Sequence, residues 1–152
     1  ALQLEHRRGQ IRGSRFVRLA IEEAAAGIAS PPEGDIRRAL LNAGWTRLMF
    51  NVDLELLDGR FLARPDVYDP VTGTCLEVDS RAYHFGVEKW EATMERHARM
   101  TAAGLAVLHA PPSRLEHRTD EVLSEFAAAV REREGHPAPR VRVRTMNGLR
   151  AG

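Results

Sequence analysis

The sequence is poor in cysteine and lysine and has no long apolar run. Cys75 is its only cysteine, which excludes an internal disulfide and a cysteine-based zinc knuckle and is typical of the reducing cytoplasm. Neither a charged-then-apolar leader nor a long apolar stretch occurs, so we predict no signal peptide and no membrane span. The net charge of +1 gives no general nucleic-acid signal, and any such binding has to come from local patches.

Arginine-rich patches lie at both ends of the chain. Lys89 is the only lysine among the 22 basic residues. Residues 1–18 carry five arginines against Glu5, and residues 136–152 carry four arginines and no acid. Arginine clamps phosphate bidentately, although GC-rich coding produces the same bias. The residues expected to contact DNA are Arg140, Arg142, Arg144 and Lys89.

The length of 152 residues fits one domain with a sizeable core. We expect a basic segment over 1–13, an α/β domain over 14–134 and a basic arm over 135–152. The alternating RVRVR near the end allows a short edge strand, but we favour a flexible arm. Because the chain starts with Ala1 rather than Met, one interpretation is a fragment of a longer protein. The oligomeric state is not indicated.

Helical spacing predicts two helices first. One starts at Ser14 and stops at Gly27, and another starts in Ser30-Pro31-Pro32-Glu33 and closes at Gly44. The apolar stripe expected on the second helix consists of Ile36, Leu40 and Leu41.

A β-hairpin is expected next, with one strand over 48–57, a turn at Asp58-Gly59 and a return over 60–64. The stretch CLEVD (75–79) reads as a third strand, and LAVLHA (105–110) as a buried fourth strand. Between them we predict a helix from about Val87 to Ala103, with Trp90, Met94 and Ala98 on its buried side. A last helix spans 113–134, with Leu123, Phe126, Ala127 and Val130 facing inward. The predicted order is α-α-β-β-β-α-β-α, with a small mixed sheet of about four strands.

Three carboxylates are expected to meet at one end of this sheet. Side chains alternate along CLEVD, so Glu77 and Asp79 share a face. Asp66 joins them if the strands around the turn DPVTGT lie side by side. Clustered like charges are costly without a neutralising cation, and oxygen ligands suit Mg²⁺ or Mn²⁺. This pattern indicates a metal-dependent phosphodiesterase.

In its order of motifs the chain resembles the PD-(D/E)XK restriction-endonuclease-like superfamily. The resemblance covers about 14–130 and rests on an early helix Glu, a hairpin, Pro65-Asp66, Glu77-x-Asp79 and a following helix and strand. Within that superfamily, EVDSRAYH (77–84) followed by WEATMERHARMTAAGLAVLHA (90–110) is similar to the branch related to the very-short-patch-repair (Vsr) endonuclease. Domains of that branch often follow a helix-turn-helix segment in abortive-infection or antitoxin-like proteins.

The resemblance implies a role for each matching residue. Asp66 and Glu77 would hold Mg²⁺ or Mn²⁺ with the Val78 carbonyl, Asp79 would stand where the superfamily's catalytic Lys stands, and Glu33 would reach the metal through water. His84 and Arg96 match the His and the helix Arg of the branch. His84 would act as general base or, when protonated, would stabilise the phosphorane, a task open also to Arg96 and Lys89. Thr93, His97 and His109 depart from the Asp, Asp and Arg usual in that branch.

Ordinary structural roles compete with each of these assignments. Asp66 can start a turn, Glu77 and Asp79 can line the solvent face of an edge strand, and Glu33 can complement a helix dipole. His84 can be a surface residue, and His97 and His109 read as structural. The leading hypothesis is a DNA endonuclease, and the alternative is a catalytically inactive DNA-binding or regulatory module of an antitoxin-like protein.

Overall fold

The computed structural model describes residues 31–78 and 87–144, which form a mixed α/β arrangement with a four-stranded and a three-stranded sheet. The helices are α3 (Pro31–Asn42), α4 (Val87–Ala102), α5 (Pro112–His117) and α6 (Thr119–Arg133). The strands are β1 (Met49–Phe50), β2 (Leu54–Leu56), β3 (Phe61–Ala63), β4 (Val67–Asp69), β5 (Thr74–Val78), β6 (Ala106–Ala110) and β7 (Val141–Val143). The chain divides after Gly44 into two compact units.

Helix α3 belongs to the first unit and confirms the second predicted helix. Prolines occupy its first turn, where their missing N–H costs nothing. The helix ends ahead of Gly44, whose φ of +91° suits glycine. Ile36 and Leu40 are buried as predicted, whereas Leu41 is 44% exposed, so its assignment to the apolar stripe was wrong. The helix predicted from Ser14 to Gly27 lies outside the described residues.

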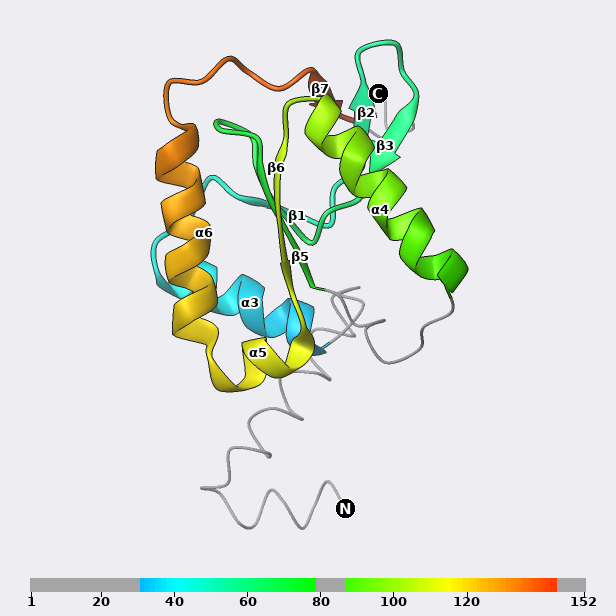
Figure 1. Cartoon of the computed structure of the whole chain (residues 1–152). Helices are drawn as coiled ribbons and strands as arrows, with labels where there is room; N and C mark the ends of the chain where they lie inside the picture. The colour runs from blue at the N-terminus through cyan, green and yellow to red at the C-terminus, as the bar shows by residue number, and fades with distance from the viewer. Residues whose placement is uncertain (1–30, 79–86, 145–152) are drawn as a thin grey trace, which may run out of the picture. The chain divides into compact units, whose positions relative to one another are not determined.

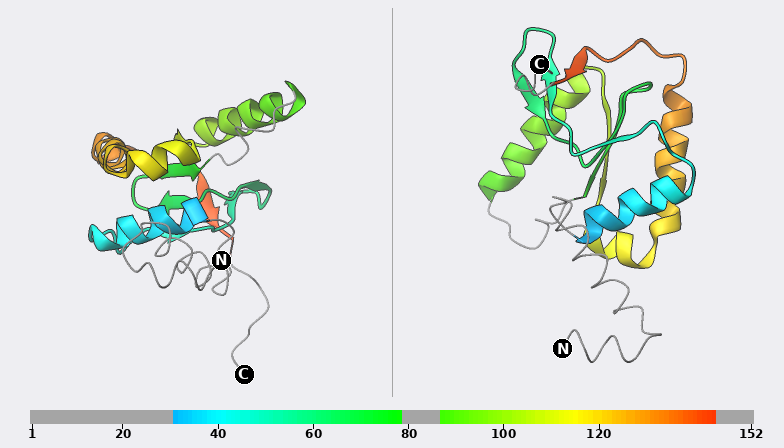
Figure 2. Two further views of the ribbon diagram at one scale, coloured as in Figure 1. Left: turned by 90° about the horizontal axis from the view of Figure 1, so that it is seen from below. Right: turned by 180° about the vertical axis from the view of Figure 1, so that it is seen from behind.

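The second unit is built on a mixed sheet with the strand order β1-β4-β5-β6. Its first three strands are antiparallel neighbours, and β6 runs parallel to β5, to which α4 connects it. This confirms the strand–helix–strand unit expected from the sequence. Helices α4 and α6 lie on opposite faces of the sheet (Figures 1 and 2). Strand β5 therefore lies inside three layers, and all five of its residues are buried.

The predicted first strand over 48–57 was wrong as a single strand. The backbone breaks at Asn51, which has a φ of +52° and so leaves the β region. Residues before the break pair with β4, and residues after it form β2 in a second sheet. The turn at Asp58-Gly59 is confirmed by the antiparallel pairing of β2 with β3. The expectation of one small sheet therefore gives way to two.

The second sheet has the order β3-β2-β7. Leu54 lies opposite Val143 and Leu56 opposite Val141, so residues 141–143 form an edge strand, and the flexible arm that the sequence favoured was wrong for this segment. The inner face of this sheet packs with α4 and the first sheet in one apolar core. That core contains Leu54, Leu62, Ala63, Tyr68, Cys75, Met100, Ala103 and Leu105.

Helix α4 has the predicted bounds but the opposite buried side. Trp90 is 56% exposed, Met94 is 49% exposed and Ala98 is exposed, so their predicted burial was wrong. Its buried apolar residue is Met100, near the C-terminal end. The N-terminal half of the helix points away from the sheet (Figure 1), which leaves its apolar side chains without a core to enter.

The last predicted helix divides into α5 and α6 at Arg118, whose φ of −138° and ψ of 43° are not helical. Phe126 and Val130 are buried on α6 as predicted, whereas Leu123 and Ala127 are half-buried.

The turn between β4 and β5 is held by Asp69, which is fully buried. Arg47 donates to both of its carboxylate oxygens, at 2.9 and 2.8 Å, and the Thr72 hydroxyl donates at 2.6 Å. Gly73 closes the turn with a φ of +72°, and a Cβ there would meet Pro139 at 2.8 Å. These contacts fix the DPVTGT turn, and this turn fixes the register of β4 and β5, the two strands that it joins.

Candidate functional site

Asp66 immediately precedes β4, which is an antiparallel neighbour of the central strand β5. The Asn51 amide donates to the Asp66 carbonyl at 3.2 Å, so the β1–β4 ladder continues through Asp66. Its carboxylate reaches the neighbouring strand, where the Val78 amide donates to Oδ2 at 2.6 Å. Asp66 is therefore fixed against the carboxyl end of β5.

The strand register sets Asp66 opposite Glu77. Val67 lies opposite Leu76 and Tyr68 opposite Cys75, and one residue further along the same register pairs Asp66 with Glu77. Residues directly opposite in an antiparallel pair point to the same face, with Cβ atoms about 5 Å apart. Two of the three carboxylates predicted to meet are thus neighbours on one face.

Glu77 is a buried carboxylate with a cationic neighbour. Its side chain is only 9% exposed, and Arg96 of α4 donates to Oε2 at 2.7 Å. Because β5 is a central strand, Glu77 does not line the solvent face of an edge strand. The partner of Arg96 is 19 residues away in the sequence, which agrees with the lack of an acid three or four places from it on its own helix.

Two histidines lie next to this contact, and one of them approaches the Glu77 oxygen to which Arg96 donates. His109 of β6 lies beside Glu77 in the parallel register, with Nδ1 at 3.7 Å from Oε2. Its Nε2 lies 2.9 Å from Nδ1 of His97, and the two rings stack with centroids 5.1 Å apart. Sequence reasoning assigned both histidines a structural role and missed this proximity. The one available signal was that His97 follows Arg96 directly.

Most of the remaining predicted site residues lie outside the described side chains. Asp79 and His84 lie outside the described residues, and Glu33 lies in the first turn of α3 with its side chain outside the description. Lys89 is exposed on α4. Within 31–78 and 87–144, no group of three His, Cys, Asp or Glu residues is placed to hold a metal ion.

Asp66 and Glu77 nevertheless suit a hard cation. Carboxylate oxygens are the donors that Mg²⁺ takes, and Mg²⁺ commonly uses one or two protein carboxylates while keeping several waters. Asp66 and Glu77, neighbours in the extended β4–β5 register, are two carboxylates of this kind. The nearby Arg96 already compensates part of the charge of Glu77 in this buried position.

Cys75, in the same strand, is not a nucleophile. It is fully buried, and burial raises the pKa of its thiol far above the ordinary value, with the charges of Glu77 and Asp69 adding to the rise. Burial likewise raises the pKa of Tyr68 to about 12. Both groups are neutral at physiological pH and serve the core.

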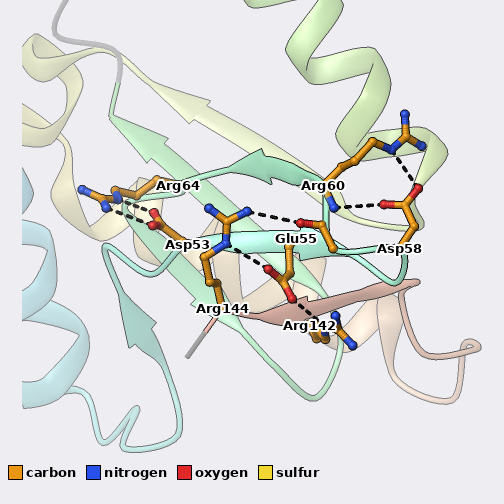
Figure 3. A network of polar contacts seen from close by, with 8 residues as sticks. Asp53, Glu55, Asp58, Arg60, Arg64, Arg142 and Arg144 are labelled. Atoms are coloured by element: carbon orange, nitrogen blue, oxygen red, sulfur yellow. Dashed lines mark hydrogen bonds and ion pairs between the residues drawn. The ribbon is translucent and has the colours of Figure 1, made fainter. Parts of the chain in front are cut away.

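A second polar cluster covers the outer face of the three-stranded sheet (Figure 3). Arg142 and Arg144 of the β7 region donate to the two oxygens of Glu55, at 2.6 and 2.9 Å. Hydrogen bonds from these guanidinium groups, first Arg144 and then Arg142, hold the pKa of Glu55 below its usual range. These ion pairs tie the edge strand β7 to β2.

The same arrangement recurs along the hairpin. Arg64 pairs with Asp53, and Arg60 pairs with Asp58 across the turn (Figure 3). The hydrogen bond from Arg64 lowers the pKa of Asp53, and the hydrogen bonds from the Arg60 backbone and side chain lower that of Asp58. Three arginines, Arg64, Arg142 and Arg144, therefore lie on one face with the carboxylates of Asp53 and Glu55, while the Arg60–Asp58 pair lies at the hairpin turn.

No protein family, no curated protein and no solved structure matches this chain. In the part of the chain that the structure describes, no helix is long and apolar enough to cross a membrane.

Proposed function

We propose that this chain is a divalent-metal-dependent DNA endonuclease of the PD-(D/E)XK type, similar to Vsr. The observation that carries the proposal is the pairing of Asp66 with Glu77 on one face of the mixed sheet, with the Asp66 carboxylate bonded to the Val78 amide at 2.6 Å. Within the four-stranded sheet, the antiparallel strands β1, β4 and β5 are followed by helix α4 and the parallel strand β6, an order that also supports the proposal.

Each residue would have a separate task. Asp66 and Glu77 would hold the ion with the Val78 carbonyl, and Asp79 would bind a second ion or orient the water. When bound, a divalent ion supplies a Lewis acid for the phosphate and lowers the pKa of a bound water. Arg96 orients Glu77 through its 2.7 Å hydrogen bond and keeps a positive charge beside the carboxylates. His84 remains the proposed proton acceptor or the cation that faces the phosphate.

The proposal is tested by nicking of a supercoiled plasmid in Mg²⁺ or Mn²⁺. The informative variant is Asp66→Asn, because an amide oxygen can still accept the Val78 hydrogen bond while the charge is lost. We expect wild-type protein to nick only with metal, and Asp66→Asn to lose nicking while keeping its circular dichroism spectrum. The control Asp120→Asn changes an exposed acid on α6 and should nick like wild type. Equal nicking by Asp66→Asn and wild type would refute the assignment.

One observation favours the alternative, a DNA-binding or regulatory module without catalysis. Glu77 is already paired with Arg96 and lies beside His109, so its charge is compensated without a metal. In that case the protein would bind DNA in the presence of EDTA and would not nick it in any metal tested.

A further inference from the structure

The arginine face is defined here as the outer surface of the three-stranded sheet, with Arg64, Arg142 and Arg144 (Figure 3) and with Phe61, which lies opposite Glu55. On this face the cations are outermost. The side chains of Arg64, Arg142 and Arg144 are 61%, 56% and 39% exposed. Two of the paired carboxylates lie deeper, since Asp53 is 25% and Glu55 is 12% exposed. An approaching molecule therefore meets guanidinium groups first.

These guanidinium groups keep donors for a further acceptor. Within the described residues, the side-chain hydrogen bond of Arg142 on this face is made by Nε alone, to Glu55. A guanidinium has five N–H donors in a rigid fork. The outer edge of each fork can therefore bind a phosphate without breaking the ion pair that orients the side chain.

An exposed aromatic ring lies among the arginines. Phe61 is 54% exposed although its strand neighbours Leu62 and Ala63 are buried. The guanidinium carbon of Arg144 lies 5.5 Å from the centroid of the Phe61 ring, within the range of a cation–π contact. The ring is thus held in place from one side while most of its surface remains open to solvent.

We propose that the arginine face binds single-stranded nucleic acid, with the arginines on phosphates and a base stacked on Phe61. Stacking platforms beside basic grooves are the usual means of binding unpaired strands. A duplex presents phosphates but no open base face, so it would use the arginines and leave the ring unused. The inference rests on the proposed function in one respect: Arg64 lies two residues before Asp66, so a strand on this face would lead toward the proposed site.

The test is fluorescence anisotropy in EDTA, with a labelled oligodeoxythymidylate and a blunt duplex of the same length. We expect tighter binding of the single strand, and a loss of about five- to hundredfold for Phe61→Ala, from the usual energy of one base stack. Phe61→Trp should restore binding. The control Val71→Ala removes an equally exposed apolar side chain, 62% exposed, from another turn and should bind like wild type.

The arginine contribution is read from the salt dependence of the same binding. Arg142→Ala should reduce the slope of log K against log salt by about 0.7, the value for one phosphate contact on a single strand. The control Arg131→Ala removes an exposed arginine of α6 and should leave the slope unchanged.

Three results would overturn the inference: equal binding by Phe61→Ala and Val71→Ala, duplex binding at least as tight as single-strand binding, or displacement of the oligonucleotide by polyglutamate as readily as by unlabelled strand. Failure of the two proposals is distinguishable. If the wild-type protein does not nick the plasmid but its oligonucleotide binding still depends on Phe61, only the nuclease proposal is refuted. If nicking depends on Asp66 but oligonucleotide binding does not depend on Phe61, only this inference is refuted.

Discussion

Removal of the Arg96 side-chain charge tests whether the stability of the fold depends on the ion pair between Arg96 and the buried Glu77. In Arg96→Met the buried Glu77 loses its 2.7 Å donor, while His109 remains at 3.7 Å. A hydrogen bond to a charged group contributes about 1.5–3 kcal/mol, and breaking a well-buried pair costs about 3–5 kcal/mol. Because Arg96 is 33% exposed, solvent screens the pair, and we expect a loss of about 2 kcal/mol in the free energy of unfolding.

The assay is urea denaturation at neutral pH, followed by circular dichroism, for Arg96→Met, Glu77→Gln and the double variant. The double variant should be destabilised by less than the sum of the single variants, by about 1–2 kcal/mol, because both remove one interaction. Arg99→Met changes an exposed arginine of the same helix and should lie within about 0.5 kcal/mol of wild type. Additive losses, or an Arg96→Met variant as stable as Arg99→Met, would refute the pairing.

Three further predictions follow from other contacts. Asp69→Ala leaves Arg47 and Thr72 without their buried acceptor and should reduce the free energy of unfolding by about 3 kcal/mol, measured in the same denaturation assay. Cys75 should react with a thiol reagent only at the rate of unfolding, because its thiol is buried and its pKa is raised; rapid labelling of the native protein would contradict its burial. The folded-state pKa of Glu55 is lowered, so its ion pairs stabilise the fold above the unfolded pKa of about 4.3 and are lost as pH falls through the folded value. Glu55→Gln should therefore flatten the acid limb of the stability profile, and an unchanged limb would contradict this.

Local sequence patterns correctly predicted the elements that depend only on residues close together in the sequence. Pro31-Pro32 and Gly44 bracket α3, Asp58-Gly59 makes the β2–β3 turn, and the run 105–110 contains β6. In each case the signal is the backbone preference or apolar run of a few neighbouring residues, and the surrounding fold did not override it.

The errors arose where distant contacts decided the outcome. The continuous pattern over 48–57 gives no sign of the break at Asn51, because the partners that separate β1 from β2 are β4 and β7, far along the chain. Helical spacing on α4 identified an apolar stripe, but Trp90 and Met94 stay exposed because that half of the helix points away from the sheet.

The sequence was enough to predict which acidic residues of the candidate site lie together. It was not enough to predict which side chains contact them. Alternation along β5 and the Gly-containing turn were enough to bring Asp66 beside Glu77. The contacts of Glu77 with Arg96 and His109 depend on how α4 and β6 pack against β5, which no local spacing encodes. The outward arginines near the C-terminus were noticed as charge, but their pairing with Glu55 requires strand β7, where the sequence analysis favoured a flexible arm.

The most direct test of the central claim is calorimetric titration of Mn²⁺ into wild-type protein and Asp66→Asn, in the absence of DNA. The opposed carboxylates of Asp66 and Glu77 predict saturable binding by the wild type that is abolished, or weakened more than tenfold, in the variant, with folding unchanged. Binding of equal affinity in both proteins, or no saturable binding by the wild type, would contradict a metal site at this pair.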